Sequence, residues 1–135
     1  MTLIGALALD GLCAAMTVPA ATSTAVFHAF VTEVLIPALR RRRPDAVVVM
    51  DNLAAHKAAA VRRAFDQAGF GHRYLPAYSP DMNPIEQAWS KLKAHLRAKA
   101  ARSREALERA IPAALGTVTP GDARGWFRHC GYQPN

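Results

Sequence analysis

Apolar and polar positions along the chain fall into blocks that predict alternating strands and helices. Two apolar stretches, TLIGALAL and LCAAMTV, flank Asp10 and Gly11, and this pattern predicts a β-hairpin with a two-residue type I′ turn. Thr22, Ser23 or Thr24 can then cap a helix. Apolar residues at helical spacing predict the buried stripe of that helix: Val26, Phe27, Phe30, Val31, Val34, Leu35, Ala38 and Leu39.

The middle of the chain contains two short segments typical of strands. The continuous apolar run AVVVM, which ends at Asp51, predicts a strand covered on both faces, and HRYLP predicts the next strand. Helices are expected over residues 54–68, where Gly69 ends the helix, from Pro84 onward, and over residues 103–115 and 120–129. This order indicates an α/β fold with an antiparallel hairpin at one side and parallel strands joined by helical crossovers.

Composition narrows the class of protein. The 135 residues suffice for one domain and are too few for two comfortable ones, and 51% hydrophobic residues allow a packed core. The formal net charge of +7 favours a polyanionic partner, with nucleic acid first and an anionic membrane surface second. No apolar run reaches the length of a membrane span, and the opening segment lacks the basic region of a signal peptide. Cys13 and Cys130 are expected to be reduced thiols of a cytosolic protein.

Two carboxylates are candidates for a metal site. Functional groups in open α/β sheets gather beyond the carboxyl ends of parallel strands. Asp51 lies at such an end, and Glu86 follows the next strand in the first turn of a helix. Each has a plainer interpretation, which is favoured when the residue is taken alone: Asp51 can form an Asx turn, and Glu86 can complete a capping box with Asn83 at a helix that begins at Pro84. Together, two acids on one rim of a basic protein favour metal-assisted phosphodiester chemistry.

A polar stripe follows the helix that carries Glu86. Its members at helical spacing are Glu86, Ser90, Lys93 and Arg97, and the apolar stripe of the same helix is Ile85, Trp89, Leu92 and Leu96. Lys93 is two turns beyond Glu86, about 10.5 Å along the axis. The candidates for contact with DNA are Lys57, Lys91, Lys93 and Arg97, and the patch is enlarged by Lys99, Arg102 and Arg104. A solvated basic helix face explains the charge equally well, so both interpretations stay open.

Two strings in the sequence resemble a known family. VVVMDNLAAHK, followed by YLPAYSPDMNPIEQAWSKLK, resembles the DDE transposases of bacterial insertion sequences in the mariner superfamily, and the likeness extends to the hairpin and the ending GWFRHCGY. The 34 residues between Asp51 and Glu86 are the interval that this branch shows between its second and third acids. The resemblance implies a ribonuclease-H-like mixed sheet with flanking helices, with a core over about residues 1–100 and a helical carboxyl-terminal extension over about residues 101–135.

The resemblance also assigns roles to individual residues. Asp51 corresponds to the second metal-binding acid and Glu86 to the third, and Lys93 matches a basic residue that contacts DNA near the cut. Asn52 and His56 match the family's Asp-Asn-x-x-x-His pattern. Asn52 is expected to orient Asp51 or contact the substrate, and His56 is expected to pack or hydrogen-bond on its helix. The loop that delivers Glu86 is expected to be shaped by Pro80, Asn83 and Pro84.

The implied activity depends on Mg²⁺ or Mn²⁺, which would activate water to cut one DNA strand before the new 3′-hydroxyl attacks target DNA. The family's first aspartate lies on a strand upstream of the hairpin, so this chain is expected to lack the first strand and its acid. Asp10, in the hairpin turn, is not expected to replace it. The expected partners are DNA and either an upstream transposase segment or further copies of the chain, with no membrane, in the bacterial cytoplasm and nucleoid.

Three functions remain open on the sequence alone. The first is a strand-transfer enzyme that becomes active when an upstream segment supplies the missing acid. The second is a catalytically inactive remnant that binds DNA or interacts with a transposase. The third is an unrelated structure-specific nuclease of similar fold, which would cleave DNA without strand transfer.

Overall fold

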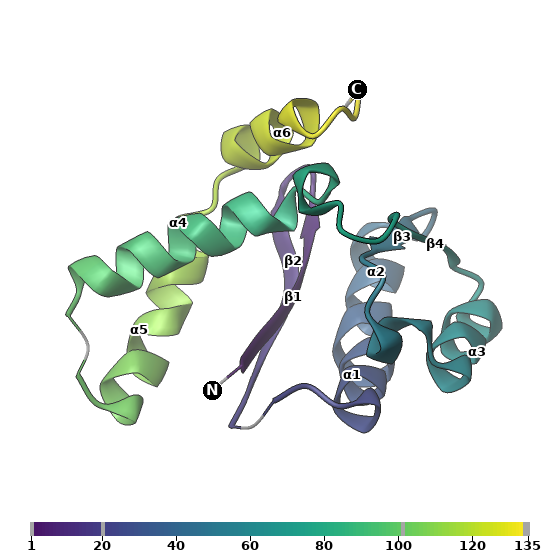
Figure 1. The fold of residues 1–135 in the computed structure, drawn as a ribbon, viewed down its shortest axis with the longest axis horizontal. Helices are drawn as coiled ribbons and strands as arrows, with labels where there is room; N and C mark the ends of the chain where they lie inside the picture. The colour runs from purple at the N-terminus through teal and green to yellow at the C-terminus, as the bar shows by residue number, and fades with distance from the viewer. Residues whose placement is uncertain (1, 20, 101, 134–135) are drawn as a thin grey trace. The chain divides into compact units, whose positions relative to one another are not determined.

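The computed structural model describes residues 2–19, 21–100 and 102–133 and shows small sheets with flanking helices (Figure 1). The strands are β1 (Thr2–Ala8), β2 (Gly11–Val18), β3 (Val47–Met50) and β4 (Gly71–Tyr74). The α-helices are α1 (Thr24–Phe30), α2 (Ile36–Arg42), α3 (Ala59–Ala68), α4 (Ile85–Ala98), α5 (Arg104–Leu115) and α6 (Pro120–His129). This order confirms the predicted α/β class.

The chain divides into two compact units. The first consists of Met1–Ala6 and Cys13–Asn83, and the second consists of Leu7–Leu12 and Pro84–Asn135. The helices α1 to α3 and the pair β3 and β4 therefore belong to the first unit, whereas α4 to α6 and the hairpin turn belong to the second. Each unit is described by itself below.

The hairpin of β1 and β2 confirms the first sequence prediction, but its turn differs from the expected type. The two turn residues are Leu9 and Asp10, and Gly11 is already the first residue of β2. A type I′ turn needs positive φ at both Asp10 and Gly11, and among the described residues of this turn only Gly11 has it, at 121°. A side chain at position 11 would be strained at this φ, and its Cβ would also lie 3.5 Å from the carbonyl oxygen of Val118.

A continuous helical rod formed by α1, a π-helical turn and α2 provides much of the first unit's core (Figure 1). Ser23 is the predicted cap, and its Oγ accepts a hydrogen bond from the Val26 amide at 3.2 Å. The π-helical turn, Val31–Leu35, directly precedes Pro37, which has no N–H to donate. The altered hydrogen-bond pattern around this proline is therefore absorbed without ending the helix.

The predicted stripe of this helix is buried in the core of the first unit, except that Val26 and Val34 are only half-buried. The core joins the rod to both strand pairs and to α3, because its members are Ile4, Phe27, Phe30, Val31, Leu35, Ile36, Leu39, Met50, Val61, Phe65 and Phe70. Burial of large apolar side chains such as Phe30 and Phe65 is the main stabilising contribution here.

The strands β3 and β4 pair in parallel, with Val47 opposite Gly71 and Met50 opposite Tyr74. The prediction that β3 is covered on both faces is wrong. Met50 is buried, but Val47 is 56% exposed and Val49 is 43% exposed. Alternate residues of a strand point to opposite faces, so one face of this two-stranded sheet packs on the core and the other presents valine side chains to solvent.

The helix expected over residues 54–68 is interrupted. A 3₁₀ turn covers Ala54–Lys57, Ala58 adopts an extended ψ of 142°, and α3 starts only at Ala59. The predicted end is confirmed, because Gly69 closes α3 with a left-handed φ of 82°. The break separates the residues that follow β3 from the regular helix.

The second unit is a cluster of three helices in which α4 contacts both α5 and α6 (Figure 1). Its buried residues are mostly small, which lets the helices approach closely: Ala88, Leu92, Ile111, Ala114, Val118 and Ala123. Ser103 caps α5, and Thr119 with Asp122 forms a capping box at α6. The two predicted carboxyl-terminal helices are thus confirmed. In the described parts of the chain, no helix combines the length and apolar character that crossing a membrane requires.

We expect Leu35→Ala to lower the free energy of unfolding of the first unit by about 2–5 kcal/mol, because it removes a side chain that is only 3% exposed. The matched control is Leu53→Ala, since Leu53 is 58% exposed and its loss should change stability by no more than about 0.5 kcal/mol. Urea unfolding followed by circular dichroism measures both variants. Equal effects of the two changes would contradict the described core.

Candidate functional site

Asp51 directly follows β3, at the carboxyl end of a strand that pairs in parallel with β4. Its Oδ1 accepts a hydrogen bond from the Leu53 amide at 3.2 Å, which is the Asx turn considered from the sequence. The side chain is nevertheless 40% exposed. Hydrogen bonding inside the turn thus holds one carboxylate oxygen without burying the group.

His56 contacts the same oxygen. Its Nδ1 lies 2.6 Å from Asp51 Oδ1. The buried Nδ1 has no hydrogen-bond partner among the described residues, so this is a close contact rather than a directed hydrogen bond.

Two contacts hold His56 in place. The imidazole packs on Phe27 with 4.3 Å between ring centroids, and its side chain is only 18% exposed. The His56 carbonyl accepts a hydrogen bond from the Tyr74 hydroxyl at 2.8 Å, which ties the 3₁₀ turn to the end of β4. His56 therefore packs as expected and, in addition, fixes the position of Asp51.

Glu86 lies in the first turn of α4 and is exposed. The predicted capping box is wrong, because α4 begins after Pro84 and no side chain makes a capping hydrogen bond there. Asn83 instead ends a 3₁₀ turn over Pro80–Met82. Without a side-chain cap, the first amides of α4 keep their positive partial charge, which favours a negative group such as Glu86 at this end.

The polar stripe on α4 is present as predicted. Glu86, Ser90, Lys93 and Arg97 are all exposed, whereas Ala88 and Leu92 on the other side of the helix are buried. Ile85, Trp89 and Leu96 of the predicted apolar stripe are half-buried. The exposed stripe therefore presents one carboxylate near the start of α4 and two cations further along the helix.

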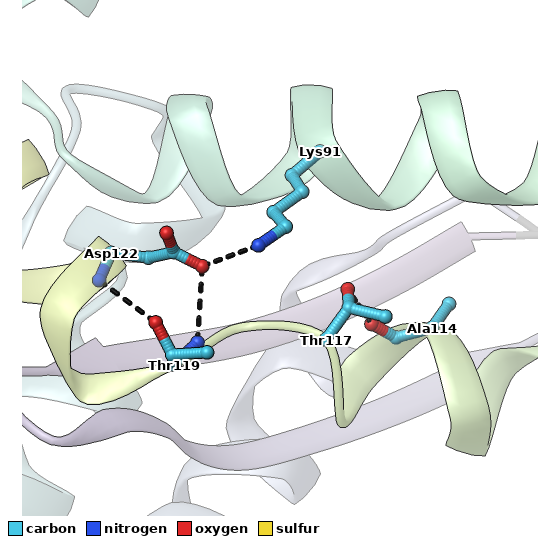
Figure 2. A network of polar contacts seen from close by, with 5 residues as sticks. All are labelled: Lys91, Ala114, Thr117, Thr119 and Asp122. Atoms are coloured by element: carbon cyan, nitrogen blue, oxygen red, sulfur yellow. Dashed lines mark hydrogen bonds and ion pairs between the residues drawn. The ribbon is translucent and has the colours of Figure 1, made fainter.

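Lys91 has an intramolecular partner. Its Nζ lies 2.5 Å from Asp122 Oδ2, an ion pair that links α4 to α6 (Figure 2). The same Oδ2 accepts a hydrogen bond from the Thr119 amide at 3.1 Å, and Thr119 Oγ1 accepts one from the Asp122 amide at 3.0 Å. The hydrogen bond from Lys91, followed by that from the Thr119 backbone, lowers the pKa of Asp122 below its usual value. Lys91 thus stabilises the packing of two helices.

Other predicted residues occupy the turn beyond Asp51. Asn52 is exposed and Lys57 is half-buried, at the end of the 3₁₀ turn. The Lys57 carbonyl accepts a hydrogen bond from Arg62 Nε at 3.0 Å, which anchors the backbone and leaves the lysine ammonium uninvolved in that bond. Asp51 and Glu86 belong to different units, and their convergence on one ion stays a prediction.

Asp51 and Glu86 are each of a ligand type that hard divalent cations prefer. Within residues 2–19, 21–100 and 102–133, no cluster of three or more His, Cys, Asp or Glu side chains is placed to hold a metal. Mg²⁺ is usually bound by only one or two carboxylates together with waters and substrate phosphates. The exposed carboxylates of Asp51 and Glu86 are ligands of this kind.

Two contacts that determine what Lys91 and His56 do in the fold could not be predicted from the sequence. Helical periodicity locates Lys91 on α4 but does not show that Asp122, 31 residues later, pairs with it. Likewise, the spacing of Asp51 and His56 does not predict that a 3₁₀ turn over Ala54–Lys57 brings the imidazole back to the carboxylate. The capping-box pattern of Thr119 and Asp122 is a sequence signal that could have drawn attention to Asp122.

Comparisons with known proteins agree with the fold described above. A family model described as DDE superfamily endonuclease matches residues 1–108. No curated protein sequence matches the chain. The predicted ribonuclease-H-like fold class is confirmed by solved structures of Mos1 transposase that match with high similarity in fold.

The catalytic domain of Mos1 transposase solved with raltegravir and Mn is 19% identical, with a TM-score of 0.78, and the match covers 95% of this chain and 68% of that chain. The catalytic domain of Mos1 mariner transposase is 20% identical with a TM-score of 0.73, and the match covers 95% of this chain and 66% of that chain. The transposase chain in the Mos1 strand transfer complex is 21% identical with a TM-score of 0.70, and the match covers 95% of this chain and 38% of that chain. This chain therefore spans about two thirds of the Mos1 catalytic domain, and identities this low establish the shared fold alone.

We expect the stability of the second unit to fall at acid pH because of Asp122. Its pKa is lowered by folding, so the ionised carboxylate stabilises the fold above its unfolded pKa, and this contribution is lost as the pH falls through the folded pKa. Asp122→Asn should remove this part of the pH dependence, which lies in the acid range at and below the ordinary pKa of an aspartate. Fluorescence is a suitable probe, because both tryptophans, Trp89 and Trp126, belong to the second unit.

The matched control is Asp45→Asn, which removes an exposed carboxylate from the turn before β3 in the other unit. It should leave the acid limb of the tryptophan-detected unfolding curve unchanged. An Asp122→Asn variant with the same pH profile as the unmodified chain would show that the Lys91 ion pair does not stabilise the second unit in solution.

Proposed function

The chain belongs to the DDE superfamily of endonucleases, and we propose that it is the part of a transposase that binds divalent metal and DNA and cuts and joins DNA strands. We propose that the source is a bacterial insertion sequence, that the site of action is the bacterial cytoplasm and nucleoid, and that the chain forms one partial catalytic domain with its core over about residues 1–100 and its helical extension over about residues 101–135.

The observation that carries this proposal is the setting of Asp51. A half-exposed carboxylate at the carboxyl end of a parallel strand, with one oxygen held by Leu53 and His56, is a rigid ligand with access to solvent. Carboxylate oxygens are the ligands that Mg²⁺ and Mn²⁺ prefer. The Mos1 catalytic domain has been solved with Mn and with Mg, and we propose the same ions for this chain.

Glu86 supplies the second carboxylate in the proposed site, from the start of α4. A bound ion of this kind activates water and stabilises the entering and leaving oxygens at phosphorus. His56 positions Asp51 through the 2.6 Å contact, and Asn52, exposed beside it, is available to the substrate. Pro84 and Asn83 define where α4 begins and thereby where Glu86 is presented.

Lys93 and Arg97 extend the proposed site along α4. Both are exposed, on the same stripe as Glu86, so a DNA strand bound at Glu86 meets two cations as it continues along the helix. Lys57, beside His56, is the proposed phosphate contact of the first unit. Lys91 is also in the proposed DNA-binding set, but its ion pair with Asp122 makes it the weakest contributor.

A further polypeptide segment completes the enzyme in this proposal. The described strands form two separate two-stranded sheets, and the valine face of β3 is exposed. Small sheets with exposed apolar residues and unpaired edges gain stability when another strand is added. We propose that an upstream transposase segment, or a further copy of the chain, provides this strand, and that the upstream segment brings the family's first metal-binding aspartate.

We expect the chain, mixed with an upstream segment that carries the family's first aspartate, to nick supercoiled plasmid DNA in Mg²⁺ or Mn²⁺ and not in EDTA. Asp51→Asn and Glu86→Gln should each slow nicking by roughly a hundredfold or more, because metal-ion catalysis contributes several kcal/mol to the transition state. Gel electrophoresis of the plasmid measures the rate. A linear product joined to target DNA would distinguish strand transfer from simple cleavage.

The control for this experiment is Asp81→Asn, which removes an exposed acid from the loop before α4 and should leave nicking unchanged. Titration calorimetry with Mn²⁺ provides a readout without catalysis. Loss of Asp51 or Glu86 should weaken binding by at least the 10–100-fold that outer-shell changes commonly cost. Salt-sensitive DNA binding without metal-dependent nicking in the complemented protein would instead identify an inactive DNA-binding remnant.

Two lysines on α4 give a matched test of DNA contact. We expect Lys93→Ala to weaken binding of duplex DNA and to lower the slope of log K against log salt by about 1, while the unfolding midpoint stays unchanged. Lys91→Ala should mainly lower the unfolding midpoint, because Lys91 pairs with Asp122. Fluorescence anisotropy at several salt concentrations and thermal unfolding measure these effects. If Lys93→Ala left DNA binding unchanged and Lys91→Ala weakened it, the DNA would not follow the exposed stripe of α4.

A further inference from the structure

A hollow in the second unit lies beyond the last turn of α4, where the chain turns into α5. It has a volume of about 650 Å³ and is open to solvent. This α4–α5 hollow is lined by Lys99, Ala100, Arg102, Ser103, Ala106, Arg109, Ala110 and Ala113. Neither Asp51 nor Glu86 lines the hollow, whereas Lys99 and Arg102, which do, belong to the basic patch expected from the sequence.

Three cations surround this hollow, and no carboxylate lines it. Among the described residues, no ion pair joins Lys99, Arg102 or Arg109 to an acid. Arg104, which is also on α5, differs from these three cations. It has an acidic partner, since its Nε lies 3.5 Å from Glu108 Oε1, and it does not line the hollow. Like charges gathered without internal compensation create a positive potential, and an external anion relieves their repulsion.

The shape and lining of the hollow indicate the class of anion. The apolar part of the lining is alanine alone, without the large hydrophobic or aromatic side chains that typically enclose a small organic ligand. An open hollow fits a polymer that passes across it better than a molecule that must be enclosed. Arginine binds phosphate through two parallel N–H donors, and two of the three cations are arginines.

The start of α5 adds to the positive potential. Ser103 lines the hollow and caps the helix, with its Oγ accepting from the Ala106 amide at 3.0 Å. The amino-terminal end of a helix carries a partial positive charge and favours phosphate groups. The cations and the helix end therefore act on the same open space.

We propose that the α4–α5 hollow binds a backbone phosphate of DNA that also contacts the exposed stripe of α4. This inference rests on the proposed function, because it extends the path of the same DNA. Glu86 and Lys99 are separated by the length of α4, roughly 20 Å at 1.5 Å per residue, with Lys93 and Arg97 between them. That distance corresponds to about six nucleotide steps along B-DNA. The hollow thus lies at the opposite end of α4 from Glu86, where the DNA backbone in this proposal leaves the helix.

The test compares two arginines of the second unit. Arg109→Gln removes a cation that lines the hollow, whereas Arg128→Gln removes the same charge from an exposed residue in the last turn of α6, which does not line it. Binding of a random-sequence duplex to the 135-residue chain is measured by fluorescence anisotropy between 50 and 300 mM salt, an interval of about the width used to resolve counterion release. We expect Arg109→Gln to lower the slope of log K against log salt by about 0.9, and Arg128→Gln to leave it unchanged.

Three outcomes separate the inference from the proposed function. Equal slopes for the two variants, with DNA binding retained, would overturn the hollow as a contact and leave the α4 stripe intact. Absence of DNA binding by the unmodified chain would overturn both proposals. A reduced slope for Arg109→Gln alone supports the inference, provided that its circular dichroism spectrum matches that of the unmodified chain. Arg109→Lys, which keeps the charge, should restore the slope and guards against a folding defect.

Inorganic phosphate gives a second, independent readout. Its addition should shift the amide resonances of residues 103–106, whereas chloride at equal ionic strength should not. Phosphate that shifts these resonances without a slope difference between the two variants would identify a site for the free ion rather than for DNA, and would overturn the proposal as stated.

Discussion

The parallel pairing of β3 with β4 is the constraint on which the candidate site depends. It places the end of β3 beside the end of β4, with Met50 opposite Tyr74, and the Leu75 amide continues the ladder by donating to the Met50 carbonyl at 2.7 Å. Tyr74 then reaches back through its hydroxyl to the carbonyl of His56. The turn after β3 is therefore held by β4 as well as by its own hydrogen bonds, so that Asp51 is presented on a fixed frame while its carboxylate stays exposed.

Most helices and strands follow from the sequence because their signals are local. Ser23, one of the three candidate caps, caps α1, and the stripe of α4 separates exposed from buried positions at helical spacing. The exposure of Val47 could not be predicted, since an apolar run shows which residues favour burial but not whether a second layer covers them. The Asn83 capping box failed for a local reason: Asn83 ends the preceding 3₁₀ turn, and Pro84 takes the capping position.

The two carboxylates of the candidate site could be proposed from the sequence, but the contacts of the residues around them could not. Asp51 and Glu86 follow strand-end and motif signals, whereas the partners of His56 and Lys91 come from segments distant in sequence. Such contacts depend on tertiary packing, which periodicity does not encode. For His56 the deciding feature is the 3₁₀ turn over Ala54–Lys57, which stands where the sequence predicted the first turn of an α-helix.

The net charge of +7 gives an incomplete picture of where a polyanion binds, because some cations are already committed within the protein. Lys91 joins α4 to α6, and Arg104 pairs with Glu108 on α5. Arg62 stacks over the Tyr74 ring at 5.9 Å and holds the backbone of the turn after Asp51. A long cationic side chain used in this way stabilises the fold and contributes less to an external contact. Among the cations of the second unit that no described ion pair commits are those on the exposed stripe of α4 and those that line the α4–α5 hollow. Charge that is uncompensated within the protein, rather than total charge, therefore defines the proposed path of DNA.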